Sequence, residues 1–261
     1  MTPVAPDILA RIVSRKREEL SEARVSLAEL RSVAETRRND RRDFAAALRA
    51  KQPAIISEIK KASPSRGLLI EDFRPIDLAK QYQDGGAAAL SVLTDRDFFQ
   101  GSLDDLKAAR AACSLPVLRK DFTISEFHVV EAAAAGADAI LLIVAILDAL
   151  QLRDFRQLAR EFGIDALVEV HDRRELQIAL ESGAEIVGVN NRDLRTFQVS
   201  LDTSVRLAPR IPPGVIKISE SGIFHAADVH NLMNAGYEAF LVGEHLVKSG
   251  DAAQAVRELV A

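Results

Sequence analysis

The stretch that decides the fold is Gly136-Ala137-Asp138-Ala139-Ile140-Leu141-Leu142-Ile143-Val144, residues 136–144. It has the form of a helix-ending glycine, a short turn and an apolar strand, since glycine readily adopts the left-handed conformation that closes a helix. The same form recurs at Gly86, Gly183 and Gly236, and successive glycines are 50, 47 and 53 residues apart. Each interval is long enough for two strand–helix units.

Apolar segments between these repeats provide the remaining strands. With the first apolar segment they make eight, which we expect over residues 54–60, 88–94, 116–121, 139–144, 166–170, 186–190, 215–220 and 239–243. Helical spacing of apolar residues, such as Leu103, Leu106 and Ala109, fills the intervals. This alternation favours an α/β fold, a (β/α)8 TIM barrel. A doubly wound open sheet is the alternative, which the even repeat toward the C-terminus disfavours.

Residues 1–50 precede the first expected strand and contain two helical patterns. Asp7 can cap a helix that has Ile12 on its apolar face, and a second helix is expected over residues 43–50. The region has too few apolar side chains for a core of its own. We therefore expect a single (β/α)8 barrel domain over residues 1–261, in which residues 1–50 form a helical extension packed on the barrel.

The charge distribution bounds the function. The net charge is −4, so nothing indicates general affinity for nucleic acid or for an anionic membrane. We interpret the charged run at residues 37–42 as a solvated loop, with an anion contact as the alternative. The longest apolar run, residues 139–147, is too short to cross a bilayer, and we recognise no signal peptide. These features lead us to expect a cytoplasmic protein.

Metal-ligating residue types are few or scattered. Cys113 is the single cysteine, which excludes an internal disulfide and a multi-cysteine metal site, and we interpret it as structural. The five histidines have no ligand spacing, so we predict no metal site and interpret them as solvated positions, mostly on helices.

Charged and polar side chains gather at the carboxyl ends of several expected strands. Glu58 and Lys60 are two residues apart and point to the same side of the first strand. Lys120, Glu169 and Asn190 end three others. In a barrel the active site lies at these ends. Structural ion pairs that close the barrel mouth are the alternative, but five such residues favour an acid–base site.

Two later strands end in glycine turns. Ser221-Gly222 follows the seventh strand, and Gly243-Glu244 follows the eighth. A glycine lets backbone N–H groups approach an anion, so we predict a phosphate bound at residues 221, 222, 243 and 244. Simple helix capping is the alternative. We expect the Glu244 carboxylate to turn away, and we expect a side chain at Gly243 to block the phosphate without disturbing the acid–base residues.

The segment Glu-Ile-Lys-Lys-Ala-Ser-Pro-Ser-Arg-Gly at residues 58–67 resembles the first-strand signature of the indole-3-glycerol-phosphate synthase family. Further similar motifs lie at residues 118–122, 141–144, 167–171, 188–194 and 219–223. The resemblance implies conversion of 1-(o-carboxyphenylamino)-1-deoxyribulose 5-phosphate to indole-3-glycerol phosphate, with release of carbon dioxide and water. It also implies a small phosphorylated substrate, no cofactor and a place in tryptophan biosynthesis.

The resemblance further implies a role for each strand-end residue. Lys120 would be the general acid at the substrate's ketone oxygen, and Glu169 would act in proton removal and dehydration. Lys60 would hold the substrate carboxylate and is a candidate acid for the later step. Glu58 and Asn190 would orient these groups. Which lysine acts in which step stays open.

The substrate-binding residues are expected around this set. Ser63 and Arg192 match substrate-contacting positions of the family, and we add Pro64, Glu220 and Ser221 from the same motifs. An apolar pocket for the substrate ring is expected from Phe99, Phe122, Leu141 and Ile143. The resemblance also implies that the N-terminal extension partly roofs the site.

Two other functions remain as alternatives. A phosphoribosylanthranilate isomerase-like barrel would have a cysteine at the end of the first strand, where this chain has Glu58 and Lys60. A non-catalytic barrel that binds a phosphorylated metabolite would not need an acid–base pair. We expect a monomer, with weak homo-oligomerisation as the alternative.

Overall fold

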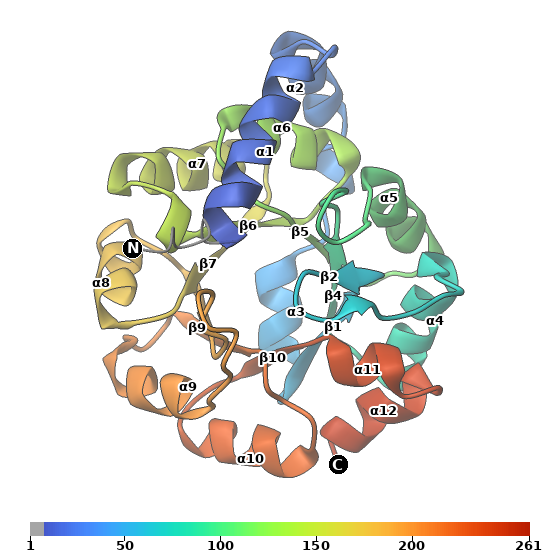
Figure 1. Ribbon diagram of the computed structural model, residues 1–261, viewed down its shortest axis with the longest axis vertical. Helices are drawn as coiled ribbons and strands as arrows, with labels where there is room; N and C mark the ends of the chain where they lie inside the picture. The colour runs from blue at the N-terminus through green and yellow to red at the C-terminus, as the bar shows by residue number, and fades with distance from the viewer. Residues whose placement is uncertain (1–7) are drawn as a thin grey trace, which may run out of the picture.

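A closed barrel of parallel strands forms the centre of the computed structural model, which describes residues 8–261 (Figure 1). The strands follow the cyclic order β1-β10-β9-β8-β7-β6-β5-β4. Their bounds are β1 Ala54–Ile59, β4 Ala89–Leu93, β5 Val117–Lys120, β6 Ala139–Ile143, β7 Asp165–Val170, β8 Ile186–Asn190, β9 Ile216–Glu220 and β10 Ala239–Val242. The predicted (β/α)8 barrel is therefore confirmed, and the open sheet is wrong.

Helices surround the barrel and return the chain from one strand to the next (Figure 1). They are α4 Pro75–Gly85, α5 Leu103–Ala112, α6 Glu126–Ala135, α7 Ala149–Glu161, α8 Arg173–Glu181, α9 Asp202–Leu207, α10 Ala226–Asn234, α11 Glu244–Lys248 and α12 Ala252–Leu259, with 3-10 turns η2 Val144–Ile146 and η3 Ala208–Arg210. Gly86 and Gly136 end α4 and α6 with φ of 93° and 92°, as the repeat predicts. Short polar side chains begin most of the helices, and Ser102 and Asp172 accept hydrogen bonds from the first turns of α5 and α8.

Three helices precede the barrel: α1 Ile8–Glu22, α2 Leu27–Thr36 and α3 Phe44–Ala50. The predicted cap Asp7 lies outside the described residues. Helix α3 agrees with the expected helix and is capped by Asp43, whereas α2 was not predicted. A capping box, in which the Ser26 and Glu29 side chains bond each other's backbone N–H, supports α2. Phe44 of α3 is fully buried in the apolar cluster of the barrel interior.

The charged run at residues 37–42 is not the solvated loop that its composition predicts. Part of it is the turn η1, Arg38–Asp40, and the next two arginines donate to backbone carbonyls of the barrel. Arg41 bonds the carbonyls of residues 133, 137 and 162, and Arg42 bonds those of residues 110 and 115. The two guanidinium groups therefore attach the N-terminal region to the barrel, a role that differs from both the expected solvated loop and the alternative anion contact.

Two further residues were expected to be structural or solvated, Cys113 and His128, and the structure corrects the expectation for His128. Cys113 is half-buried at the end of α5 and is a free thiol. His128 is not a solvated helix position: its ring is buried, its Nδ1 accepts the Ile124 N–H at 3.2 Å, and burial lowers its pKa to about 3. Within residues 8–261, no helix is both long and apolar enough to span a membrane.

Candidate active site

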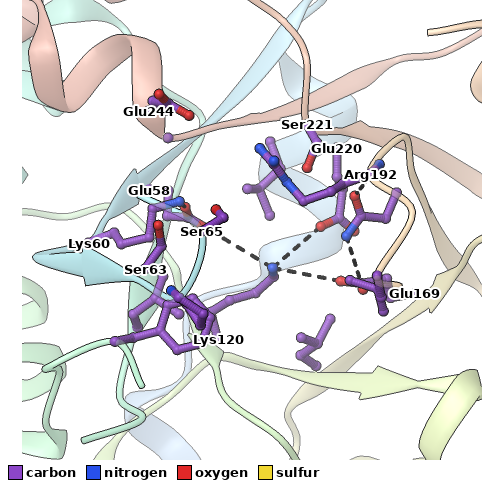
Figure 2. A pocket seen from close by; sticks show the side chains of 18 of the residues that line it. Glu58, Lys60, Ser63, Ser65, Lys120, Glu169, Arg192, Glu220, Ser221 and Glu244 are labelled. Atoms are coloured by element: carbon purple, nitrogen blue, oxygen red, sulfur yellow. Dashed lines mark hydrogen bonds and ion pairs between the residues drawn. The ribbon is translucent and has the colours of Figure 1, made fainter. Parts of the chain in front are cut away.

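A cavity opens at the carboxyl ends of the strands, and every residue nominated from the sequence lines it (Figure 2). The nominated residues are Glu58, Lys60, Ser63, Pro64, Phe99, Lys120, Phe122, Leu141, Ile143, Glu169, Asn190, Arg192, Glu220, Ser221, Gly222, Gly243 and Glu244. Barrel closure brings these residues together, because the parallel strands all end at the same rim.

Lys120 lies at the centre of the cavity among three carboxyl groups (Figure 2). Its Nζ is 4.0 Å from Glu58 Oε2, 3.7 Å from Glu169 Oε2 and 3.6 Å from Glu220 Oε2. Burial opposes the charge, but Glu169, Glu220 and Glu58 outweigh it and raise the Lys120 pKa. Lys120 therefore carries its proton at neutral pH.

Glu58 and Lys60 form a direct ion pair on the opposite side of Lys120 from Glu169 (Figure 2). Burial raises the Glu58 pKa, yet the charges of Lys60 and Lys120 prevail and lower it overall. The Glu58 carboxylate occupies the space where a Cβ at Gly243 would lie. A side chain at Gly243 would therefore displace Glu58, and the expectation that it leaves the acid–base residues undisturbed is wrong.

Glu169 is held from two sides. Asn190 donates from Nδ2 to its Oε1 at 3.1 Å, and His171 Nε2 lies 3.3 Å from the same oxygen. His171 Nδ1 lies 2.9 Å from Glu175 Oε2 on α8. Burial favours neutral groups here, but Lys120 and His171 lower the Glu169 pKa, and the two glutamates raise the His171 pKa to about 10. His171 is thus a half-buried partner of Glu169 and not the solvated residue that the sequence suggested.

Glu220 is the carboxyl group of this set whose pKa is raised above its usual value. Burial and the neighbouring Glu169 charge raise its pKa to about 8, despite the opposing effect of Lys120. Its carboxyl oxygens have no hydrogen-bond partner among the described residues, although Lys120 is near enough for an ion pair. A buried carboxyl group that faces a cavity and makes no hydrogen bond is available to a bound molecule.

Apolar side chains form the wall beside Lys120. The rings of Phe99 and Phe122 have centroids 6.0 Å apart and planes inclined by 37°. Leu141 and Ile143 of β6 continue the wall. Helix α1 adds residues that the sequence analysis did not nominate, namely Ile8, Leu9 and Ile12. The position of these residues agrees with the roof over the site that the family resemblance implies, although the sequence did not show which side chains of α1 would face the cavity.

The other end of the cavity is more polar. The chain after β1 forms a small hairpin, β2 Ala62–Ser63 and β3 Gly67–Leu68, that carries Ser63 and Pro64. Ser221 has φ 68° and Gly222 φ 81°. The Glu244 carboxylate lies 2.8 Å from Lys248 Nζ and 3.4 Å from Arg66 Nε, and it points away from Lys120 (Figure 2). These contacts agree with the expected orientation of Glu244.

Metal-binding geometry is not found in this cavity or elsewhere in residues 8–261, where no group of three or more His, Cys, Asp or Glu side chains could hold an ion. The cavity instead combines a charged lysine, carboxyl groups whose pKa values are shifted in opposite directions, and an apolar wall. This arrangement suits proton transfer on a small molecule that has an apolar part.

The barrel resembles those of other solved structures. A mutant tryptophan synthase alpha-subunit from Pyrococcus furiosus has a TM-score of 0.61 at 17% identity, over 80% of this chain and 98% of that chain. An N-acetylmannosamine-6-phosphate 2-epimerase from Clostridium perfringens has a TM-score of 0.62 at 15% identity, over 78% of this chain and 91% of that chain. These likenesses show the fold alone.

Sequence comparisons are more specific. The family model described as indole-3-glycerol phosphate synthase matches residues 9–259. Proteins of that name from Aromatoleum aromaticum and Laribacter hongkongensis are 51% and 52% identical to this chain, over 97% and 98% of it and over 98% and 99% of their own lengths. These findings support neither the isomerase nor the non-catalytic barrel. The chain belongs to the indole-3-glycerol phosphate synthase family.

Proposed function

We propose that this enzyme closes the ring of 1-(o-carboxyphenylamino)-1-deoxyribulose 5-phosphate to form indole-3-glycerol phosphate, as a carboxy-lyase of tryptophan biosynthesis. One observation carries the assignment of roles: protonated Lys120 lies among three buried carboxyl groups beside an apolar wall. The reaction needs an acid at a ketone oxygen, a base for dehydration and a dry pocket for a ring, and all three are adjacent here.

In the first step, Lys120 donates its proton to the ketone oxygen. The ring carbon that bears the carboxylate attacks the carbonyl carbon, so a C–C bond forms and the oxygen becomes a hydroxyl. Carbon dioxide then leaves, and the electrons of its bond restore the aromatic ring. Phe99 and Phe122 hold the ring against the ketone and exclude water, which favours loss of the carboxylate.

In the second step, the new hydroxyl leaves as water and the indole double bond forms. Lys60, which first holds the substrate carboxylate, supplies the proton to the leaving hydroxyl. Glu169 removes a proton from the adjacent carbon, and its lowered pKa keeps it ionised for that task. Glu58 orients Lys60, and Asn190 orients Glu169.

The polar end of the cavity would bind the rest of the substrate. Neutral Glu220 donates a hydrogen bond to a substrate hydroxyl, and Arg192 with Ser63, Pro64 and Ser221 completes the polar contacts. The backbone N–H groups at residues 222, 243 and 244 bind the phosphate. The positive φ of Gly222 supports this proposal, because such a conformation exposes successive N–H groups in a turn.

Lys120→Met tests the assignment of the acid. We expect kcat to fall by about 10²–10⁴-fold, the usual loss for a positioned acid, while the fold is retained. Fluorescence of the indole product measures the rate, and circular dichroism checks the fold. Lys107→Met removes the same charge from an exposed pair on α5 and is the matched control. A Lys120→Met variant that keeps more than about a tenth of kcat would contradict the assignment.

We also propose that the protein is a cytoplasmic monomer. The free thiol of Cys113 suits a reducing compartment, and each nominated residue lies in a cavity that one chain completes. Every step above is a proton transfer or a rearrangement of substrate bonds, so the proposal needs no cofactor. Light scattering at micromolar concentration tests the monomer, and a dimer under those conditions would contradict it.

A further inference from the structure

Lys16 is a buried cation that the proposed chemistry does not use. It lies on α1, which runs outward over the barrel rim near β5 and β6 (Figure 1). Only 4% of Lys16 is exposed, although its neighbours Arg15 and Arg17 are on the surface side of the helix. A lysine is seldom buried without a partner that repays its lost hydration.

Lys16 pairs with Glu19 of its own helix, whose Oε2 is 3.1 Å from Nζ, and with two buried aspartates at the ends of neighbouring strands. Lys16 Nζ is 3.0 Å from Asp95 Oδ2, after β4, and 2.9 Å from Asp121 Oδ1, after β5. Asp95 is fully buried, and within residues 8–261 Lys16 is its only ion-pair partner. Burial disfavours the Lys16 charge, but Asp121 and Asp95 outweigh it and raise the Lys16 pKa.

Each aspartate also holds the loop that carries one ring of the apolar wall. Asp95 Oδ1 accepts the N–H groups of Phe98 at 2.8 Å and of Phe99 at 3.2 Å. Asp121 Oδ1 accepts the Phe122 N–H at 2.8 Å. The Lys16 ammonium group therefore joins the loop after β4 to the loop after β5. It does so next to Phe99 in the first loop and Phe122 in the second.

We propose that Lys16 is a positioning residue for the substrate ring: through Asp95 and Asp121 it holds Phe99 and Phe122 at the spacing that the ring requires. The inference rests on the proposed function, because it takes these two residues as the ring pocket. It assigns the N-terminal extension a role in ring recognition beyond covering the cavity.

Lys16→Met tests the proposal, because it removes the charge and keeps an apolar stem. We expect KM for the substrate to rise about tenfold while kcat falls less than about threefold, since Lys120 and Glu169 are untouched. Lys16→Arg retains a cation that can reach both aspartates, and we expect it to recover most of the loss. Arg15→Met is the matched control: Arg15 joins the same helix to the same loop through Asp97, at 2.5 Å, but on the surface. KM should stay within about twofold of wild type in that control.

If Lys16→Met does not fold, a double variant, Lys16→Met with Asp95→Asn, allows the same KM measurement. The asparagine retains the Oδ1 acceptor for the Phe98 and Phe99 N–H groups and removes the unpaired buried charge. A folded double variant whose KM remains raised at least about fivefold supports positioning. Recovery of both thermal stability and KM would overturn the proposal, because Lys16 would then serve stability alone.

Hydrogen exchange separates this inference from the proposed function. Lys16→Met should speed exchange of the Phe98, Phe99 and Phe122 amides about tenfold or more, and Arg15→Met should leave them unchanged. Unchanged exchange in Lys16→Met would overturn the positioning role even if KM rises. If wild-type protein forms no indole product, the proposed function is wrong. The amide exchange rates would still show whether Lys16 holds the two loops.

Discussion

At the scale of single residues, His171 affects the charge of Glu169, the proposed proton acceptor. The imidazole lies between Glu169 and Glu175, at 3.3 Å and 2.9 Å. Both carboxylates favour the imidazolium, which in turn favours ionised Glu169 together with Lys120. His171 therefore favours the ionised form of Glu169, the proposed base, and is not itself one of the proposed substrate-contacting residues.

His171→Leu should shift the acid limb of the kcat profile to higher pH. Glu169 works as a base only when ionised, and loss of the adjacent positive charge raises its pKa. We expect a shift of about one pH unit or more, with most of the rate recovered on the alkaline side. Initial rates from about pH 3 to about 9 measure the limb, because the Glu169 pKa is lowered well below its usual value.

Glu175→Gln is the matched control for His171. It keeps the imidazole beside Glu169 but removes one of the two charges that raise the His171 pKa. Its acid limb should stay close to that of wild type, because the imidazole is still protonated at acid pH. An acid limb that is identical in all three proteins would rule out His171 as a determinant of the Glu169 charge.

At the scale of elements, the turns after β9 and β10 form the proposed phosphate site but also carry a negatively charged side chain, Glu244. Glu244 begins α11 at the end of the cavity where we propose the phosphate, and its carboxylate pairs with Lys248 and Arg66. These partners reduce the effective negative charge but do not remove it. The turn geometry therefore favours an anion, while this side chain opposes it.

Glu244→Gln should lower KM for the substrate, by about twofold to tenfold at low salt. The gain should shrink above about 0.5 M salt, because ions screen charges at this distance. Steady-state rates at two salt concentrations measure both effects. Glu181→Gln makes the same change in net charge on α8, where Glu181 bonds Gln177, and should not alter KM. An unchanged or higher KM in Glu244→Gln would place the phosphate elsewhere.

At the scale of the whole molecule, the N-terminal region and the barrel share their interior. Ala34 of α2 is fully buried and belongs to the same apolar cluster as the outer strand faces. Arg41 and Arg42 bond carbonyls of the barrel, and Lys16 is buried against two strand ends. We propose on this basis that residues 1–261 are one domain with residues 1–50 as an extension of it.

The domain proposal predicts one cooperative thermal transition, with calorimetric and van't Hoff enthalpies that agree. Removing residues 1–24 deletes α1 and leaves α2 in place, so it should lower Tm and weaken product binding more than it slows a single turnover. Calorimetry, equilibrium binding and rapid quenching measure these quantities. A separate low-temperature transition in the full chain would contradict one domain. Unchanged affinity with a hundredfold slower chemical step would make the extension catalytic.

The sequence by itself determined the order of the eight barrel strands, their alternation with helices and the residues at the strand ends. These features depend on periodicity, capping and glycine conformation, which act within a few residues. Glu58, Lys60, Lys120, Glu169 and Asn190 were identifiable because the parallel strands of such a barrel direct their ends to a common rim.

Only the tertiary structure decided which charges meet. Arg41 and Arg42 belong to a run that looks solvated, yet their acceptors are carbonyls 68 to 121 residues away. Lys16 is one of four basic residues on α1, and only helix docking selects it for burial. The pKa of Glu220 is raised and that of Glu169 is lowered because their neighbours differ, and the residue type, which is the same, gives no sign of this. Electrostatic partners depend on distance in space, which no local pattern in the chain encodes.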